Sequence, residues 1–227
     1  MQLNQKSFRH ALCVLLTIFA LATVSAAQGL ADQSVLSKIK IKNFGQMDDR
    51  FYRGAQPREE DYRDLAALGI KTIIDLRDDP KEYERPMAEA LGMRYVNIPM
   101  VSKKYPTEAA IRDFLKVVND PATGKFYVHC AGGRHRTGAV GAVYRYQFYQ
   151  WNFDQVYQEM KKYDFYTSWG HGAFKDFVQD YYRHIQTAQA QAATTTTTTN
   201  TPVRTAREPV TANVGSVQVS DSLKDKR

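Results

Sequence analysis

The sequence has little cysteine and no long hydrophobic run. Its 227 residues include two cysteines, Cys13 and Cys130, which excludes a disulfide framework. The longest apolar run, residues 11–24, is shorter than the roughly 20 residues that a transmembrane helix needs. Internal repeats and a nucleotide-binding fingerprint are also absent. The remaining composition, 43% apolar and 24% charged, is that of an ordinary globular protein.

Residues 1–27 are predicted to be a secretory signal peptide. Lys6 and Arg9 precede the apolar run, and the small residues at 24–27 offer a cleavage site. An uncleaved N-terminal anchor is the alternative. Cleavage would remove Cys13 and give a periplasmic or secreted protein with no stable membrane insertion. Cys130 would then be the single thiol of an exported chain, which favours a reactive cysteine over a structural one.

Residues 187–227 are predicted to be a disordered, Thr-rich tail. The segment has no aromatic residue, and six consecutive threonines begin at Thr194. Such a segment buries too little apolar surface to offset the entropy lost on ordering. Residues 28–186 therefore form the single predicted domain.

Basic charge is modest once the two ends are set aside. The whole chain carries a formal charge of +7, but residues 28–186 hold 24 Lys and Arg against 21 Asp and Glu, a net +3. This excludes the broad basic surface of a general nucleic-acid binder. An anionic partner would have to be recognised by a local arrangement of charges.

The predicted elements alternate between strands and helices. Apolar patterning and turn residues predict strands at 39–44, 50–53, 71–76, 93–98 and 125–129, and helices at 58–68, 82–91, 107–118, 138–149, 153–163 and 173–185. Gly69 and Gly92 are placed as C-terminal caps and Thr107 as an N-terminal cap. We therefore expect an α/β domain with a central, mostly parallel sheet flanked by helices.

Aromatic residues are concentrated between positions 144 and 182. Their helical spacing favours packing between the C-terminal helices. A stacking surface for a base or sugar is the alternative.

The segment at 129–138, HCAGGRHRTG, follows an apolar strand and precedes a helical pattern. A loop at a helix N-terminus presents unpaired N–H groups and the positive end of the helix dipole. Gly132 and Gly133 let the backbone curl around a ligand, so the loop can surround a tetrahedral anion. Arg136 can add a two-pronged contact to phosphate oxygens.

Cys130 stands at the base of this loop. A free cysteine has a pKa of about 8.5, and a helix N-terminus with nearby cations lowers it. We therefore expect Cys130 to be a thiolate at neutral pH and a nucleophile toward phosphorus. An inert buried thiol is the alternative.

The chain here resembles the cysteine-dependent protein tyrosine phosphatase superfamily, whose signature is His-Cys, five residues, then Arg followed by Ser or Thr. His129, Cys130, Arg136 and Thr137 fill that signature. The run at 133–138 is most similar to the plant-and-fungal-type atypical dual-specificity phosphatases and their bacterial relatives. FYRGAQP at 51–57 and IDLR at 74–77 resemble the upstream segments of that group.

The resemblance implies a role for each residue of the loop. Cys130 would form a phosphocysteine, Arg136 would hold the phosphate, and Thr137 would stabilise the departing thiolate. His129 would orient the loop. The alternatives are that His129 is only a hydrogen-bonded histidine at the end of a strand and that Thr137 is only a helix cap. The predicted phosphate-binding residues are Ala131, Gly132, Gly133, Arg134, His135 and Arg136. No cofactor and no metal is expected, because His129, Cys130 and His135 offer no ligand geometry within an anion loop.

One feature of the pattern is missing. Most relatives carry an aspartate general acid some thirty residues before the cysteine, but residues 98–106, IPMVSKKYP, contain no acid. Asp78, Asp79 and Glu108 are the nearest candidates, and none of them is preferred. Asp113 and Asp120 are expected on the outer face or at the end of a helix.

The missing acid favours a leaving group that departs without a proton. A tyrosine phenol has a pKa of about 10, whereas a phosphate group has one of about 6. Lys103, Lys104, Arg134 and His135 would also attract a polyanion. We therefore expect a phosphorylated, anionic substrate such as an inositol polyphosphate or pyrophosphate, with phosphotyrosine and phosphoserine proteins as the other substrates to consider. A catalytically weak phosphate-binding module is the alternative function, and a rhodanese-type sulfurtransferase ranks below both.

Overall fold

The computed structural model describes residues 34–198, with side chains as far as residue 192. Residues 34–36 are helical, and twelve further elements follow them. In chain order they are β1 (Gly45–Gln46), β2 (Phe51–Ala55), α2 (Asp61–Ala67), β3 (Ile70–Arg77), α3 (Glu84–Ala90), β4 (Arg94–Met100), α4 (Glu108–Asn119), the 3-10 turn η1 (Pro121–Thr123), β5 (Lys125–Cys130), α5 (His135–Tyr149), α6 (Phe153–Lys162) and α7 (Gly172–Thr198).

The five strands form one sheet in the order β1-β2-β5-β3-β4. The pairs β2·β5, β5·β3 and β3·β4 are parallel, and the short β1 joins β2 as an antiparallel edge. The α/β domain with a mostly parallel sheet is therefore confirmed. Because parallel strands end at a common edge, the segments that follow β3, β4 and β5 meet beyond their carboxyl ends, where open α/β sheets bind ligands.

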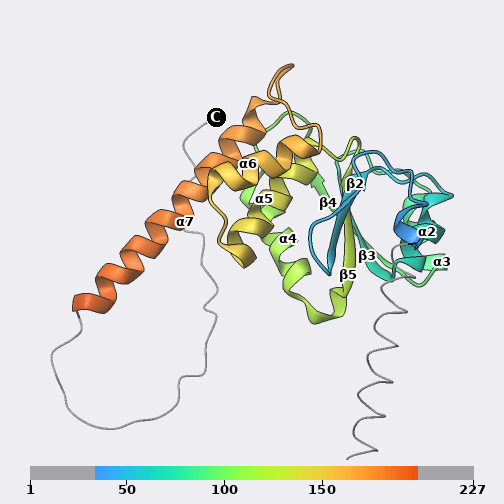
Figure 1. Ribbon diagram of the computed structural model, residues 1–227, viewed down its shortest axis with the longest axis horizontal. Coiled ribbons are helices and arrows are strands. Elements are labelled where there is room, and N and C mark those ends of the chain that lie inside the picture. Colours follow the sequence, from blue (N-terminus) through green and yellow to red (C-terminus); the bar gives the residue numbers. More distant parts are fainter. Residues whose placement is uncertain (1–33, 199–227) are drawn as a thin grey trace, which may run out of the picture. The chain divides into compact units, whose positions relative to one another are not determined.

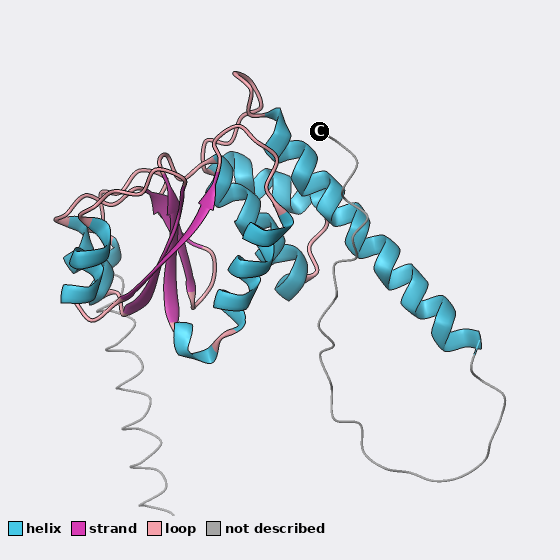
Figure 2. Ribbon diagram, turned by 180° about the vertical axis from the view of Figure 1, so that it is seen from behind, coloured by secondary structure: helices cyan, strands magenta, loops and turns pink. Residues whose placement is uncertain are grey.

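Helices cover both faces of the sheet, α2 and α3 on one face and α4, α5, α6 and the first turns of α7 on the other (Figures 1 and 2). Side chains alternate between two apolar clusters, as the period of a strand requires. On β5, Phe126 and Val128 belong to the larger cluster with α4 to α7, and Tyr127 belongs to the smaller one with α2 and α3. The same alternation sends His129 and Cys130 to opposite faces.

The three predicted caps are present where the pattern placed them. Gly69 and Gly92 end α2 and α3 with φ of +80° and +72°, the left-handed conformation that glycine adopts without strain. The Thr107 hydroxyl accepts a hydrogen bond from the amide of Ala110 at the start of α4. These caps set the entry and exit of the helices that frame the sheet.

The predicted strand at 39–44 is wrong. Lys42 and Asn43 form a turn there, Asn43 has φ of +54°, and the first strand is the two-residue β1. A turn with one residue in the left-handed region cannot continue an extended strand. The turn brings the side chain of Asn43 to the loop after β5.

Helix α5 begins at His135, three residues before the predicted start at Gly138. His135, Arg136 and Thr137 are therefore part of its first turn. The amide of Gly138 already donates to the carbonyl of Arg134, at 2.9 Å, as an intrahelical bond. The loop that was predicted to bind an anion is therefore only four residues long, from Ala131 to Arg134.

Helix α7 extends to Thr198 and so includes the first residues of the predicted disordered tail. Ala and Gln, which dominate residues 188–193, have high helix propensity. The compact unit that contains the domain ends at Thr187. The predicted signal peptide at 1–27 and the tail from residue 199 lie outside the described residues. Within residues 34–198, no helix combines the length and the apolar character that crossing a membrane would require.

Candidate active site

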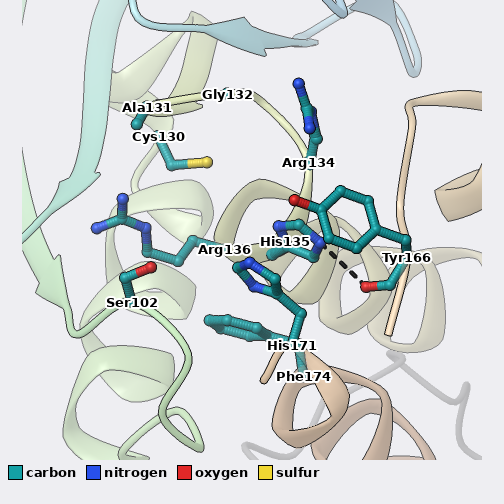
Figure 3. A pocket seen from close by; sticks show the side chains of 10 residues that line it. All are labelled: Ser102, Cys130, Ala131, Gly132, Arg134, His135, Arg136, Tyr166, His171 and Phe174. Atoms are coloured by element: carbon teal, nitrogen blue, oxygen red, sulfur yellow. Dashed lines mark hydrogen bonds between the residues drawn. The ribbon is translucent and has the colours of Figure 1, made fainter. Parts of the chain in front are cut away.

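The last residue of β5 is Cys130, and its sulfur lies at the base of the loop that leads into α5 (Figure 3). The residue pairs with Ala55 of β2, while its neighbour His129 pairs with Asp75 of β3. Cys130 is 4% exposed. The sheet therefore fixes the thiol at the centre of its carboxyl edge, in front of the α5 N-terminus.

The carbonyl groups of the loop point away from its centre, because each has a hydrogen-bond donor outside it. The donors come from the turn after residue 41, from β2, from the segment after β2 and from α5. The bonds are Asn43 Nδ2 to Gly132 O at 2.8 Å, Arg53 Nη2 to Gly133 O at 2.6 Å, Gln56 N to Ala131 O at 3.4 Å and Gly138 N to Arg134 O at 2.9 Å. With its carbonyls directed outward, the loop turns its N–H groups toward the sulfur, the arrangement that binds anions.

Gly133 is the residue that lets this loop close. It has φ of +65°, and a Cβ atom there would lie 2.5 Å from the backbone nitrogen of Ala55. That contact is too short for any side chain, and the atom it meets belongs to the backbone of the sheet edge. Only glycine therefore allows the loop to pack directly against the end of β2.

The environment of Cys130 favours the thiolate. Burial alone would raise its pKa, but the Thr137 hydroxyl, the Arg136 guanidinium and the amides of Thr137 and Arg134 outweigh burial and lower the pKa below the ordinary cysteine value. The Thr137 hydroxyl is buried and has no other hydrogen-bond partner in the described residues, which leaves the sulfur as its partner. This direction is the one that the motif predicted for a nucleophilic cysteine.

Arg136 is held at the ends of two neighbouring strands. Its Nη1 donates to the carbonyls of Leu76 at 3.4 Å and Met100 at 3.0 Å, and to Asp78 Oδ1 at 2.8 Å. Across residues 34–198 these three bonds all use Nη1, so Nε and Nη2 are left for phosphate oxygens. The side chain is 8% exposed, which pre-organises the guanidinium beside the sulfur.

Arg53 is a buried cation that the sequence pattern did not single out. It lies 1% exposed beneath the loop, with its guanidinium 4.0 Å from the ring centre of Tyr163. Burial lowers its pKa to about 10, so it stays charged at neutral pH, and it interacts electrostatically with Cys130. An arginine in a strand otherwise occupied by buried apolar residues was the only sequence signal for it.

His129 belongs to a buried charge network on the opposite face of the sheet. Its Nε2 lies 2.9 Å from Glu84 of α3 and its Nδ1 lies 3.7 Å from Asp75. Burial opposes protonation, but these two carboxylates outweigh it and raise the pKa of His129 above its ordinary value. His129 directly precedes Cys130 in the chain, and its contact with Glu84 of α3 fixes the ring and favours its protonated form.

The same three side chains could in principle hold a metal, since their ligand atoms lie within 4.8 Å of one another. The two carboxylates already have other partners: Glu84 accepts from the Tyr62 hydroxyl at 2.8 Å, and Asp75 accepts from the Tyr95 hydroxyl at 2.7 Å and the Arg77 amide at 2.8 Å. These donors and the imidazole satisfy the carboxylates, so we interpret the cluster as an ion-pair network.

A pocket of about 370 Å³ opens in front of the sulfur (Figure 3). Its walls come from the loop, from the segment after β4 and from the segment between α6 and α7. The lining residues are Ser102, Cys130, Ala131, Gly132, Arg134, His135, Arg136, Tyr166, His171 and Phe174. The predicted loop residues are thus brought together, except Gly133, which faces the sheet.

None of the three candidate general acids lines this pocket. Asp78 bonds Arg136, Asp79 forms a 2.5 Å ion pair with Arg77, and Glu108 pairs with Arg112 along α4. The bond from Arg77 lowers the pKa of Asp79, which makes it a poor proton donor at neutral pH. Asp113 is exposed on the outer face of α4, as expected.

The aromatic residues of the last third mostly pack. Tyr144, Tyr146, Phe177 and Tyr181 are buried in the larger apolar cluster, which confirms the packing interpretation for them. Tyr166 and Phe174 differ, because both line the pocket beside His135. His171, the other pocket residue from this region, was not selected from the sequence at all.

A buried thiol with a lowered pKa at the base of the loop, with an arginine fixed in the first turn of the helix that follows, is the arrangement expected of a cysteine-based phosphatase. The family model described as a DSP-PTPase phosphatase fused to NAD+ kinase matches residues 35–180. The chain belongs to this family, whose members are phosphoric monoester hydrolases.

Curated relatives carry two kinds of name. The chain is 29% identical over 126 residues to the probable tyrosine-protein phosphatase DG1060 of Dictyostelium discoideum, covering 53% of this chain and 75% of that one. It is 30% identical over 126 residues to the inositol diphosphatase DSP3 of Arabidopsis thaliana, covering 53% and 61%. The inositol diphosphatase SIW14 of Saccharomyces cerevisiae is 27% identical over 136 residues, covering 56% and 47%.

Solved structures agree on the fold. The catalytic core of Siw14 superposes with a TM-score of 0.54 at 21% identity, covering 67% of this chain and 94% of that one. TpbA of P. aeruginosa superposes with a TM-score of 0.53 at 21% identity, covering 61% and 84%. The α/β architecture is thus that of dual-specificity-type phosphatases.

Replacing Gly133 by Ala tests the close approach of the loop to β2. We expect kcat/KM for p-nitrophenyl phosphate to fall at least about 100-fold, because the displaced loop no longer directs its amide N–H groups at the phosphate oxygens. Gly92→Ala is the matched control, since Gly92 also has positive φ but a Cβ there meets nothing within 4 Å. It should cost about 1 kcal/mol of stability and leave activity intact. Equal loss of activity in both variants would contradict the account.

The pH dependence of alkylation tests the thiolate. The rate of Cys130 modification by iodoacetamide should rise through an inflection below about 8.5, the ordinary cysteine value. Thr137→Val removes the hydroxyl and should move the inflection upward, and Thr137→Ser should restore it. A wild-type inflection at or above 8.5, or one indifferent to Thr137→Val, would show that the site does not activate the sulfur.

Proposed function

We propose that the chain hydrolyses phosphate from small polyphosphorylated molecules, inositol polyphosphates or pyrophosphates, through a phosphocysteine intermediate. The observation that carries the proposal is the lining of the pocket: two arginines, two histidines and, among the described residues, no carboxylate. Such a pocket attracts dense negative charge and supplies no acidic side chain to protonate a leaving oxygen.

The first step transfers the phosphoryl group to sulfur. The Cys130 thiolate attacks phosphorus, the S–P bond forms, and the bond from phosphorus to the leaving oxygen breaks, that oxygen keeping the electron pair. Arg136 and the inward amides bind the three remaining oxygens and the charge that develops on them. Because these donors are already fixed by the fold, they need little reorganisation during the reaction.

The second step regenerates the thiolate. A water molecule attacks phosphorus, the S–P bond breaks, and its electron pair returns to sulfur, while the water proton leaves with inorganic phosphate. The Thr137 hydroxyl, already bonded to the sulfur, stabilises the thiolate as it departs. The same contacts that lower the pKa of Cys130 therefore make it a good leaving group.

The leaving group decides which substrates suit this pocket. A phenolate, with a pKa of about 10, departs slowly without an acid, whereas a phosphate of pKa about 6 departs readily as an anion. A phosphoanhydride therefore needs no aspartate on residues 98–106. Two relatives, DSP3 and SIW14, are named inositol diphosphatases, which supports the same substrate class.

A substrate panel tests the proposal. We expect the wild-type chain to release phosphate from inositol pyrophosphates with a kcat/KM at least about tenfold above that for phosphotyrosine peptides, since the anhydride leaves without an acid. Cys130→Ser should abolish both activities. A preference for the peptides would assign the chain to protein phosphatases, and no turnover of any phosphate ester or anhydride would make it a phosphate-binding module.

We also propose that the enzyme is exported. Support comes from the sequence alone, the basic start, the apolar run at 11–24 and the small residues that follow. Expressed with its first 27 residues in a bacterium with a Sec pathway, the mature protein should be recovered outside the cytoplasm with its N-terminus at residue 27 or 28. An intact N-terminus in the cytoplasmic fraction would contradict export.

A further inference from the structure

A pair of stacked histidines forms the wall of the pocket opposite the sulfur-bearing strand. The ring centres of His135 and His171 lie 3.7 Å apart with 9° between their planes. His135 belongs to the first turn of α5, and His171 immediately precedes α7 (Figure 3). Two segments far apart in the sequence therefore meet through these rings.

The two imidazoles have different hydrogen bonding. Nε2 of His135 bonds the carbonyl oxygen of Tyr166 at 3.0 Å, which fixes that ring. His171 is 91% buried, yet its Nδ1 has no partner within the described residues. A buried polar atom without a partner is costly in a folded protein, and its position in the wall of an anion-binding pocket points to a ligand.

Basic groups surround the stack. The positive charges of Arg134 and Arg136 lower the pKa of both rings. Lys103, from the segment after β4, lowers the pKa of His171 as well. Two carboxylates face these cations: Asp164 lies 4.0 Å from Arg134 Nε and is more than half exposed, and Asp78 Oδ1 lies 2.8 Å from Arg136 Nη1. The Tyr166 ring completes the cage, edge-on to both imidazoles. Three cations therefore lie around the stack against two carboxylates, so the wall is electropositive before any ligand binds.

We propose that His171, together with His135 and Arg134, forms a second anion subsite that binds a phosphate of the substrate other than the one being transferred. This rests on the proposed function, in which the substrate carries several phosphates. Cys130, the loop amides and Arg136 bind the transferred group, and the histidine wall selects for a further phosphate. His171 is thus a specificity-determining residue and takes no part in bond cleavage.

Occupation of the subsite should be coupled to proton uptake. Burial and the neighbouring cations lower the pKa of His135 to about 4 and that of His171 below its ordinary value, so both rings are neutral in the empty pocket at neutral pH. A phosphate dianion beside them raises these values again. Binding then takes up a proton, and affinity for a two-phosphate ligand falls as pH rises.

Calorimetry on the full-length Cys130→Ser chain tests this without requiring turnover. The probes are inorganic pyrophosphate and inorganic phosphate, titrated at pH 6 and pH 8 in buffers of different ionisation enthalpy, which reports proton uptake. We expect pyrophosphate to bind about tenfold more tightly than phosphate at pH 6, with proton uptake, and to lose much of that advantage at pH 8.

Adding His171→Gln should reduce the pyrophosphate advantage to about threefold or less and remove most of the proton uptake. Retained affinity for inorganic phosphate shows that this variant is folded with an intact loop. His184→Gln is the matched control, on the exposed surface of α7, and should change neither ratio nor proton uptake.

An unchanged ratio and unchanged proton uptake in His171→Gln would overturn the inference, as would equal binding of the two probes by the parent chain. Failure of the proposed function has a different signature. In that case the wild-type enzyme leaves inositol pyrophosphates intact in the substrate panel, while the binding ratio and its dependence on His171 persist.

Discussion

The active site depends on the outward direction of the carbonyl groups between Cys130 and α5. A short loop can surround an anion only if its N–H groups converge, and they converge here because a donor outside the loop holds each carbonyl. Asn43, Arg53 and Gln56 supply three of these donors from the N-terminal side of the domain. The parts of the chain before and after the nucleophile thus build one cradle.

Two buried basic side chains lie next to this loop, on opposite sides of it. Arg53 lies beneath the loop and His129 lies on the far face of the sheet, where Glu84 and Asp75 neutralise it. Buried charges are costly unless they are paired, so their placement fixes the registers of β2, β3 and α3 around β5. Helix α3 is therefore linked to the nucleophile through the contact of Glu84 with His129, the residue directly before Cys130.

The sequence allowed the fold class, the loop and its nucleophile to be predicted, because local signals carry them: alternating strand and helix periods, glycine caps, and a motif contained within ten residues. Asn43, Arg53 and His171 escaped prediction for a physical reason. Each of them makes its contact with a residue at least 35 positions away in the sequence. The hydrophobic periodicity around each residue therefore carries no information about that contact. The strand expected at 39–44 was wrong because the apolar residues Ile41 and Phe44 flank a turn. That turn places Asn43 where it donates to the carbonyl of Gly132, a contact that no local pattern predicts.

The most direct measurement is rapid acid quench during turnover of a ³²P-labelled substrate, followed by mapping of the labelled peptide. We expect the quench to trap a phosphoryl group on the peptide that contains Cys130, formed within the first turnover and lost as free phosphate appears. Phosphate release with no label on that peptide, or with label on another residue, would contradict the central claim that the cradled sulfur is the nucleophile.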